Sequence, residues 1–148
     1  MANTRVLTGR AEIPHREWVE FDFHVNGENL ITDIHFRTNG CFDMIAAAKN
    51  IVATQKGRPL SQLSHKGANH WDILIREVFE RVNGTFKFPN VETEVCHCRR
   101  IPATRIDEAI ILGAHTPEQV TAWTTASSGC GTCRPEVEKI IAFRLKGR

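Results

Sequence analysis

Four of the five cysteines in this sequence form two close pairs in its second half. One residue separates Cys96 from Cys98 and two separate Cys130 from Cys133, with 31 residues (99–129) between the pairs. In a reducing compartment, clustered cysteines are more often metal ligands or redox groups than structural disulfides. Packing as small apolar groups is common for single cysteines and improbable for two tight pairs. The pattern therefore predicts a metal–sulfur centre.

The ligand set suits two kinds of centre. Four thiolates are the usual complement of a two-iron, two-sulfide cluster, and soft sulfur ligands also bind zinc. Zinc sites more often use C-x-x-C for both pairs, so the single-residue gap between Cys96 and Cys98 favours the cluster and leaves zinc as the alternative. No histidine beside Cys133 matches His97, which argues against a cluster with mixed histidine and cysteine ligands.

The remainder of the second half predicts three short helices. We expect Thr104 to cap the first, which ends at Gly113, and Thr116 with Gln119 to form a capping box at the second. The third begins near Pro135, where its amide groups would face an anionic cluster. So small a core gives only marginal stability from apolar burial alone, so we expect a bound metal to stabilise the fold. The residues expected to be buried are Ile106, Ile110, Val120, Trp123, Val137, Ile140, Ile141 and Leu145.

The first half has the pattern of a small α+β unit. Residues 19–25 alternate apolar and polar side chains, which predicts a half-buried strand. Asn26-Gly27 predicts a tight hairpin turn into a returning strand, and helices are expected over 42–55 and about 69–82. The expected core residues are Val19, Phe21, Phe23 and Val25, then Leu30, Thr32, Ile34 and Phe36, then Ile45, Ala48 and Val52, and finally Trp71, Leu74, Ile75, Val78 and Val82.

A break between the two halves lies at residues 84–94, which have no helical period and contain glycine, proline and asparagine. We expect one domain over 1–84, a linker over 85–94 and a second domain over 95–148. The predicted fold class is an α+β N-terminal domain of antiparallel strands with helices, followed by a small all-α domain that binds the metal.

Composition narrows the class of protein. Nineteen basic and 17 acidic residues give a net charge of +2 without a basic patch, so no nucleic-acid partner is expected. The sequence has no apolar run of 18 residues and no signal-peptide pattern at its start, which predicts a cytoplasmic protein that binds no membrane. We do not expect an enzyme, because we find no phosphate loop, catalytic carboxylate pair or nucleophile with a recognisable base.

The second half resembles a known family. Residues 95–141, from "VCHCRRIPATRIDEAI" to "SSGCGTCRPEVEKII", are similar to the bacterioferritin-associated ferredoxins, helical domains that bind a two-iron, two-sulfide cluster. The resemblance implies that Cys96, Cys98, Cys130 and Cys133 are the cluster ligands. It is strongest toward the central domain of NifU-type proteins, whose ending is similar to "GCGTCRPEVE" here.

The first half resembles the NifU and IscU scaffold domain, on which new iron–sulfur clusters are assembled. The stretches "ITDIHFRTNGC", "KGRPLSQ" and "ANHWDILIREVFERVN" carry this likeness. The family holds its nascent cluster with three cysteines, an aspartate and a histidine. By resemblance, Cys41 matches the middle cysteine and His70 the histidine, while His15 and Glu17 fall at the first cysteine and the aspartate. Trp71 replaces the last cysteine.

Two interpretations of the first half follow. In one, His15, Glu17, Cys41 and His70 converge as a mixed site for iron or zinc, since carboxylate, thiolate and imidazole all bind these metals. In the other, the scaffold fold persists without its chemistry, and Trp71 fills the former site with apolar bulk.

The resemblances imply an iron–sulfur protein that acts in cluster assembly or in its supporting electron transfer. Its expected partners are the assembly machinery or a redox protein, and a homodimer stays open. The alternative function is a zinc-stapled adapter that binds the assembly machinery and carries out no redox chemistry. A third hypothesis is a true scaffold, which would form a second, labile cluster on the first half.

Overall fold

The computed structural model describes residues 4–89, 94–96, 99–129, 131 and 133–146. The chain divides into two compact units: a first unit of Met1–Lys66 with Leu74–Phe86, and a second unit of Gly67–Ile73 with Lys87–Arg148. Helix α2 (His70–Val82) runs without a break through this division and is described with the first unit. Within the described part of the chain, no helix has both the length and the apolar character that crossing a membrane requires.

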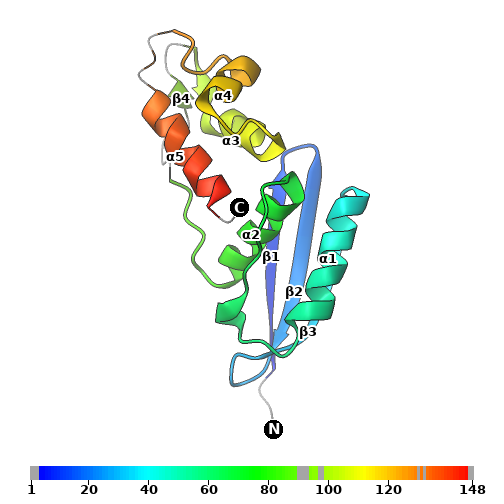
Figure 1. The fold of residues 1–148 in the computed structure, drawn as a ribbon. Helices are drawn as coiled ribbons and strands as arrows, with labels where there is room; N and C mark the ends of the chain where they lie inside the picture. The colour runs from blue at the N-terminus through cyan, green and yellow to red at the C-terminus, as the bar shows by residue number, and fades with distance from the viewer. Residues whose placement is uncertain (1–3, 90–93, 97–98, 130, 132, 147–148) are drawn as a thin grey trace. The chain divides into compact units, whose positions relative to one another are not determined.

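A three-stranded antiparallel sheet forms the frame of the first unit (Figure 1). Its strands follow the chain order: β1 (Arg5–Ile13), β2 (Glu17–Val25) and β3 (Ile31–Thr38). The predicted alternation of β2 is confirmed, because its four apolar side chains are fully buried and the residues between them are half-buried. These four residues are Val19, Phe21, Phe23 and Val25.

Strand β1 was not predicted, and Gly9 explains why. The inward positions of β1 carry Ala11 and Ile13, but the third is a glycine, so the apolar alternation is too short to recognise. A Cβ atom built on Gly9 would lie 2.8 Å from Val82 Cγ1 and 3.0 Å from Val78 Cγ1. Glycine at this position therefore lets α2 pack directly on the strand backbone.

The connection between β2 and β3 is a hairpin, as predicted, but it is longer than a tight turn. It spans Asn26–Leu30, and the Asn26 side-chain oxygen accepts hydrogen bonds from the backbone N–H groups of Glu28 and Leu30. Asn29 has a left-handed backbone with φ of 61°. Leu30 forms an isolated bridge with Pro59 and so lies outside β3.

A β-bulge changes which residues of β3 face the core. Val25 pairs with Ile31 but its neighbour His24 pairs with Asp33, which leaves Thr32 as the extra residue. Ile31 is consequently buried and Thr32 is exposed. The prediction that Thr32 faces inward was wrong, because one additional residue reverses the alternation of side chains beyond it.

Two helices complete the first unit. The bounds of α1 (Phe42–Gln55) match the prediction, and α2 begins one residue later than expected. The buried face of α1 was predicted only in part. Its run of three alanines makes the helical repeat of apolar residues hard to position along the sequence. Met44, Ala48 and Ile51 are buried there, while Ile45 and Val52 are half-buried. On α2, Ile73, Leu74, Ile75, Val78 and Phe79 are buried, and Trp71 and Val82 are half-buried.

The second unit holds a short hairpin and three helices. Strands β4 (Glu94–Cys96) and β5 (Ile101–Pro102) pair antiparallel, which corrects the expectation of an all-α domain. Such short strands leave no alternation for a sequence to reveal. The helices are α3 (Ala103–Leu112), α4 (Pro117–Thr124) and α5 (Arg134–Leu145). Their shared core contains Val95, Cys96, Ile101, Ala103, Ile106, Ala109, Ile110, Ala114, Val120, Ala126, Cys133, Val137 and Ile140.

The start of α3 differs from the prediction. Pro102 occupies the N-cap position and Thr104 lies inside the first turn, so the expected cap at Thr104 was wrong. Pro102 has the extended backbone of an N-cap residue, with φ of −73° and ψ of 154°, and its side chain makes no capping hydrogen bond. The predicted end is confirmed, because Gly113 follows the last turn with a φ of 132°.

The predicted cap of α4 is confirmed. Thr116 Oγ1 accepts a hydrogen bond of 3.1 Å from the Gln119 backbone N–H. Val120 is buried as expected, but Trp123 is 50% exposed and the prediction that it faces inward was wrong. Thr124 takes the inward position instead, because its hydroxyl is satisfied by the Val120 carbonyl.

A buried ion pair links α3 to α5. Arg144 Nε and Nη2 donate to the two carboxylate oxygens of Asp107 at 2.7 and 2.8 Å. The guanidinium also lies over the rings of Phe88 and Phe143. Only 6% of the Arg144 side chain is exposed, and the Asp107 carboxylate compensates its buried charge.

We expect Asp107→Asn to lower the free energy of unfolding by about 3 kcal/mol, because Arg144 then stays buried without the charge of Asp107. Urea unfolding followed by circular dichroism measures the loss. Glu136→Gln is the control, since it removes the partner of Lys139 from an exposed pair and should cost far less. Equal losses in the two variants would contradict the role assigned to this pair.

Candidate metal centres

Two of the four cysteines predicted as cluster ligands lie in the core of the second unit. Cys96 is 1% exposed and Cys133 is 6% exposed, and both belong to the same apolar cluster. Cys98 and Cys130 lie outside the described residues. One thiol from each predicted pair is therefore part of a single small core.

Local structure fixes both thiols. Cys96 ends β4 and pairs with Ile101 across the hairpin. Cys133 is the N-cap residue of α5, and its carbonyl accepts a hydrogen bond of 3.1 Å from the Val137 N–H. Gly131 precedes it with a φ of 73°, a conformation that favours glycine. Cys133 thus lies at the end of α5 that carries the partial positive charge of the helix dipole.

A hydroxyl group contacts one of these thiols. Ser127 Oγ lies 2.9 Å from Cys133 Sγ, within hydrogen-bonding distance. Sequence reasoning did not identify Ser127, because a serine six residues before a cysteine is not a recognisable signal. The contact arises from the left-handed backbone of Ser127, which has a φ of 63°.

Charged groups near Cys133 are paired with one another. Arg134 donates to Glu118 at 2.8 Å and to Glu138 at 3.1 Å. The pKa of the Glu118 carboxyl is lowered, first by a backbone N–H group at the start of α4 and then by Arg134. The pKa of Arg134 is raised, chiefly by its hydrogen bond to Glu118. The exposed pair with Glu118 joins the start of α5 to α4, whereas the pair with Glu138 lies within α5.

The donor chemistry of the described residues fits an anionic, sulfur-ligated group. A helix N-terminus and a hydroxyl group lie beside Cys133, where they offset the cost of placing negative charge on a buried sulfur ligand. Apolar neighbours such as Ile106 and Val120 keep water away from them.

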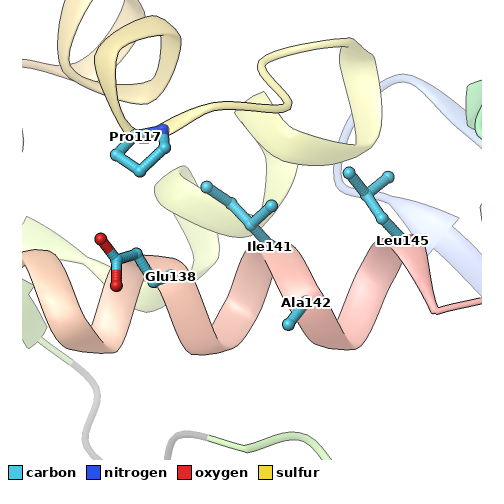
Figure 2. A pocket seen from close by; sticks show the side chains of 5 residues that line it. All are labelled: Pro117, Glu138, Ile141, Ala142 and Leu145. Atoms are coloured by element: carbon cyan, nitrogen blue, oxygen red, sulfur yellow. The ribbon is translucent and has the colours of Figure 1, made fainter.

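A hollow of about 300 Å³ lies elsewhere on this unit, between the start of α4 and α5 (Figure 2). Its lining contains no thiol or imidazole, and its one carboxylate, Glu138, already accepts from Arg134. Ile141 lines the hollow and is only half-buried, although it was expected in the core. The lining residues are Pro117, Glu138, Ile141, Ala142 and Leu145.

A second group of possible metal ligands consists of Glu17, Cys41 and His70. Each offers one ligand atom, and these atoms lie within 4.8 Å of one another. Cys41 is exposed, whereas Glu17 and His70 are half-buried. His15, the fourth residue predicted for this site, is not a member of the group and lies in the exposed turn between β1 and β2 with a φ of 61°.

The start of β2 is held in place by the end of β3. Asn39 Oδ1 accepts from the Trp18 N–H at 2.8 Å, and Asn39 Nδ2 donates to the Arg16 carbonyl at 3.2 Å. Thr38 Oγ1 donates to the Trp18 carbonyl at 2.6 Å. These bonds surround Glu17 in the chain and so fix the backbone from which its carboxylate extends.

Glycine at position 40 makes room for that carboxylate. A Cβ atom on Gly40 would collide with Glu17 Oε1 and with the Met44 side chain. Without it, Glu17 Oε1 accepts a hydrogen bond of 3.2 Å from the Cys41 N–H. Cys41 is the N-cap residue of α1.

His70 is the first residue of α2 and packs edge-to-face on Trp71, with ring centroids 5.0 Å apart. Carboxylate, thiolate and imidazole together form a ligand set that suits zinc or iron. The three residues come from the start of a strand and the starts of two helices.

Comparison with known proteins supports the iron–sulfur interpretation. Residues 94–142, about a third of the chain, match the model of the BFD-like 2Fe-2S binding domain family. The chain is also 32% identical over 82 residues to the nitrogen fixation protein NifU of Leptolyngbya boryana. That match covers 49% of this chain and 39% of the relative, so the chain spans about two fifths of the length of the curated protein it matches. Both similarities agree with the resemblance read from the sequence, and they support a NifU-like chain whose second half is similar to BFD-like 2Fe-2S binding domains.

Proposed function

We propose that this chain binds a 2Fe-2S cluster and takes part in iron–sulfur cluster assembly or in the electron transfer that supports it. The ligands are Cys96, Cys98, Cys130 and Cys133. The match of residues 94–142 to the BFD-like family carries the proposal, because that range contains both cysteine pairs. A cluster of this type, when bound, accepts and returns one electron at a time.

The described residues of the second unit supply the surroundings that such a cluster requires. Cys96 and Cys133 present sulfur within one apolar core, which limits access of water. The N-terminus of α5 places partial positive charge beside Cys133, where it would face an anionic cluster. The ion pairs of Arg134 hold that helix end in position.

The proposed partners are the iron–sulfur assembly machinery or a redox protein, which the similarity to NifU supports. The alternative is an adapter in which the same four thiolates hold zinc and serve only to stabilise the fold. The family match favours iron over zinc.

A second function is favoured by the group in the first unit. We assign Glu17, Cys41 and His70 to a mixed site for one iron or zinc ion, on a fold like that of the NifU and IscU scaffold. Zinc–ligand bonds of about 2.0–2.3 Å place tetrahedral ligand atoms roughly 3.3–3.8 Å apart. The three ligand atoms, within 4.8 Å of one another, need to close by only about 1 Å.

The cluster is tested by its metal and sulfide content. We expect anaerobically purified protein to be red-brown, with two iron and two sulfide per chain and visible absorption that dithionite bleaches. Cys133→Ser should lose this absorption because it removes a ligand. Cys41→Ser is the matched control and should retain it. Colourless protein with stoichiometric zinc that Cys133→Ser loses and Cys41→Ser retains would establish the adapter instead.

The mixed site is tested by adding Co²⁺ to cluster-loaded protein. We expect one Co²⁺ per chain, with a thiolate-to-cobalt charge-transfer band that Cys41→Ser abolishes. Glu17→Gln and His70→Gln should each weaken binding at least tenfold, because each removes a ligand. His15→Ala should leave the affinity unchanged. A loss with His15→Ala would restore the four-ligand prediction, and binding that survives Cys41→Ser would remove the site.

Gly40→Ala tests the geometry of this site. We expect the added methyl group to displace the Glu17 carboxylate and weaken Co²⁺ binding about tenfold to a hundredfold. Gly27→Ala is the control, because a Cβ atom at Gly27 meets no atom within 4 Å. Titration of both variants by absorbance measures the difference, and equal affinities would show that Glu17 does not need this space.

A further inference from the structure

The contact between Ser127 and Cys133 has a definite direction once Cys133 binds a metal. Ser127 Oγ and Cys133 Sγ are 2.9 Å apart, and in the metal-free protein either atom can donate. A cysteine that ligates a metal is a thiolate and carries no proton. The serine hydroxyl is then the donor and the ligand sulfur is the acceptor.

The backbone at Ser127 is unusual for a residue with a side chain. Its φ of 63° lies in the left-handed region, where glycine is the default residue. Thr125, two residues earlier, has a φ of 67° even though it is β-branched. The chain thus keeps a hydroxyl-bearing residue where glycine would be less strained.

Other hydroxyl groups hold this turn in shape. Thr121 Oγ1 donates to the Ala126 carbonyl at 2.7 Å, and Thr124 Oγ1 accepts from the Ala126 N–H at 3.2 Å. The Ser128 N–H donates to the Thr125 carbonyl at 3.2 Å. Ala126 is fully buried between these bonds. The turn therefore presents the Ser127 hydroxyl to Cys133 from a fixed backbone.

We propose that Ser127 is a positioning residue whose hydroxyl donates to the Cys133 thiolate and raises the reduction potential of the bound cluster. The inference rests on the proposed function, in which Cys133 is a cluster ligand. Reduction adds one electron, and so one negative charge, to the cluster and its sulfurs. A hydrogen bond to sulfur stabilises the more negative state and makes reduction easier.

The test is the midpoint potential of Ser127→Ala and Ser127→Gly in cluster-loaded protein, measured by anaerobic titration with dithionite and redox mediators. Both variants remove the hydroxyl, but glycine relieves the left-handed strain that alanine keeps. We expect both potentials to shift to more negative values by similar amounts. Ser128→Ala is the matched control, since the Ser128 hydroxyl donates to the Thr125 carbonyl, and its potential should equal that of the wild type.

Unchanged potentials in both variants would overturn the proposal. A shift in Ser127→Ala alone would assign the effect to backbone strain and would also overturn it. Loss of the cluster from both variants would show that Ser127 serves cluster retention, which contradicts the role stated here. Iron and sulfide content of the wild type, measured first, separates these outcomes from failure of the proposed function, in which the wild type itself holds no cluster.

Discussion

The second unit depends on the burial of sulfur in a small apolar core. Cys96 and Cys133 occupy core positions that would otherwise belong to aliphatic side chains. A buried thiolate without a compensating charge is costly, so under the proposed function the charge of a bound metal would offset that of the sulfurs. Under the proposed ligation, short helices that bury little surface would gain from this link, because the metal would join β4 to the start of α5. Under the proposed function, folding of this unit and binding of its metal would therefore be coupled.

In the first unit, two glycines allow side chains to pack closely against the backbone. At Gly9, the absence of a Cβ atom lets α2 pack against β1, and at Gly40 it lets the Glu17 carboxylate reach the Cys41 N–H. Both contacts are local in space and distant in sequence. The second contact places the Glu17 carboxylate, at the start of β2, beside the N-terminus of α1.

Sequence patterns predicted the regular secondary structure that local sequence rules govern. The alternation in β2, the bounds of α1 and the cap at Thr116 all follow from local rules, and the structure confirms them. The bulge at Thr32 and the strand around Gly9 could not be predicted, because they depend on what packs from elsewhere. The candidate sites divide in the same way. The spacing of the cysteines predicts them as metal ligands, whereas the contact of Ser127 with Cys133 depends on a left-handed turn that no sequence motif predicts.

The two candidate centres differ in how solvent reaches their sulfur ligands. Cys41 is exposed, so small chelators can approach a metal on it directly, and exchange there should be fast and set by ligand affinity. The sulfurs of Cys96 and Cys133 are reached only after the surrounding core opens. One chain would thus combine a kinetically labile metal, suited to being handed on, with a kinetically inert one, suited to staying in place through many turnovers.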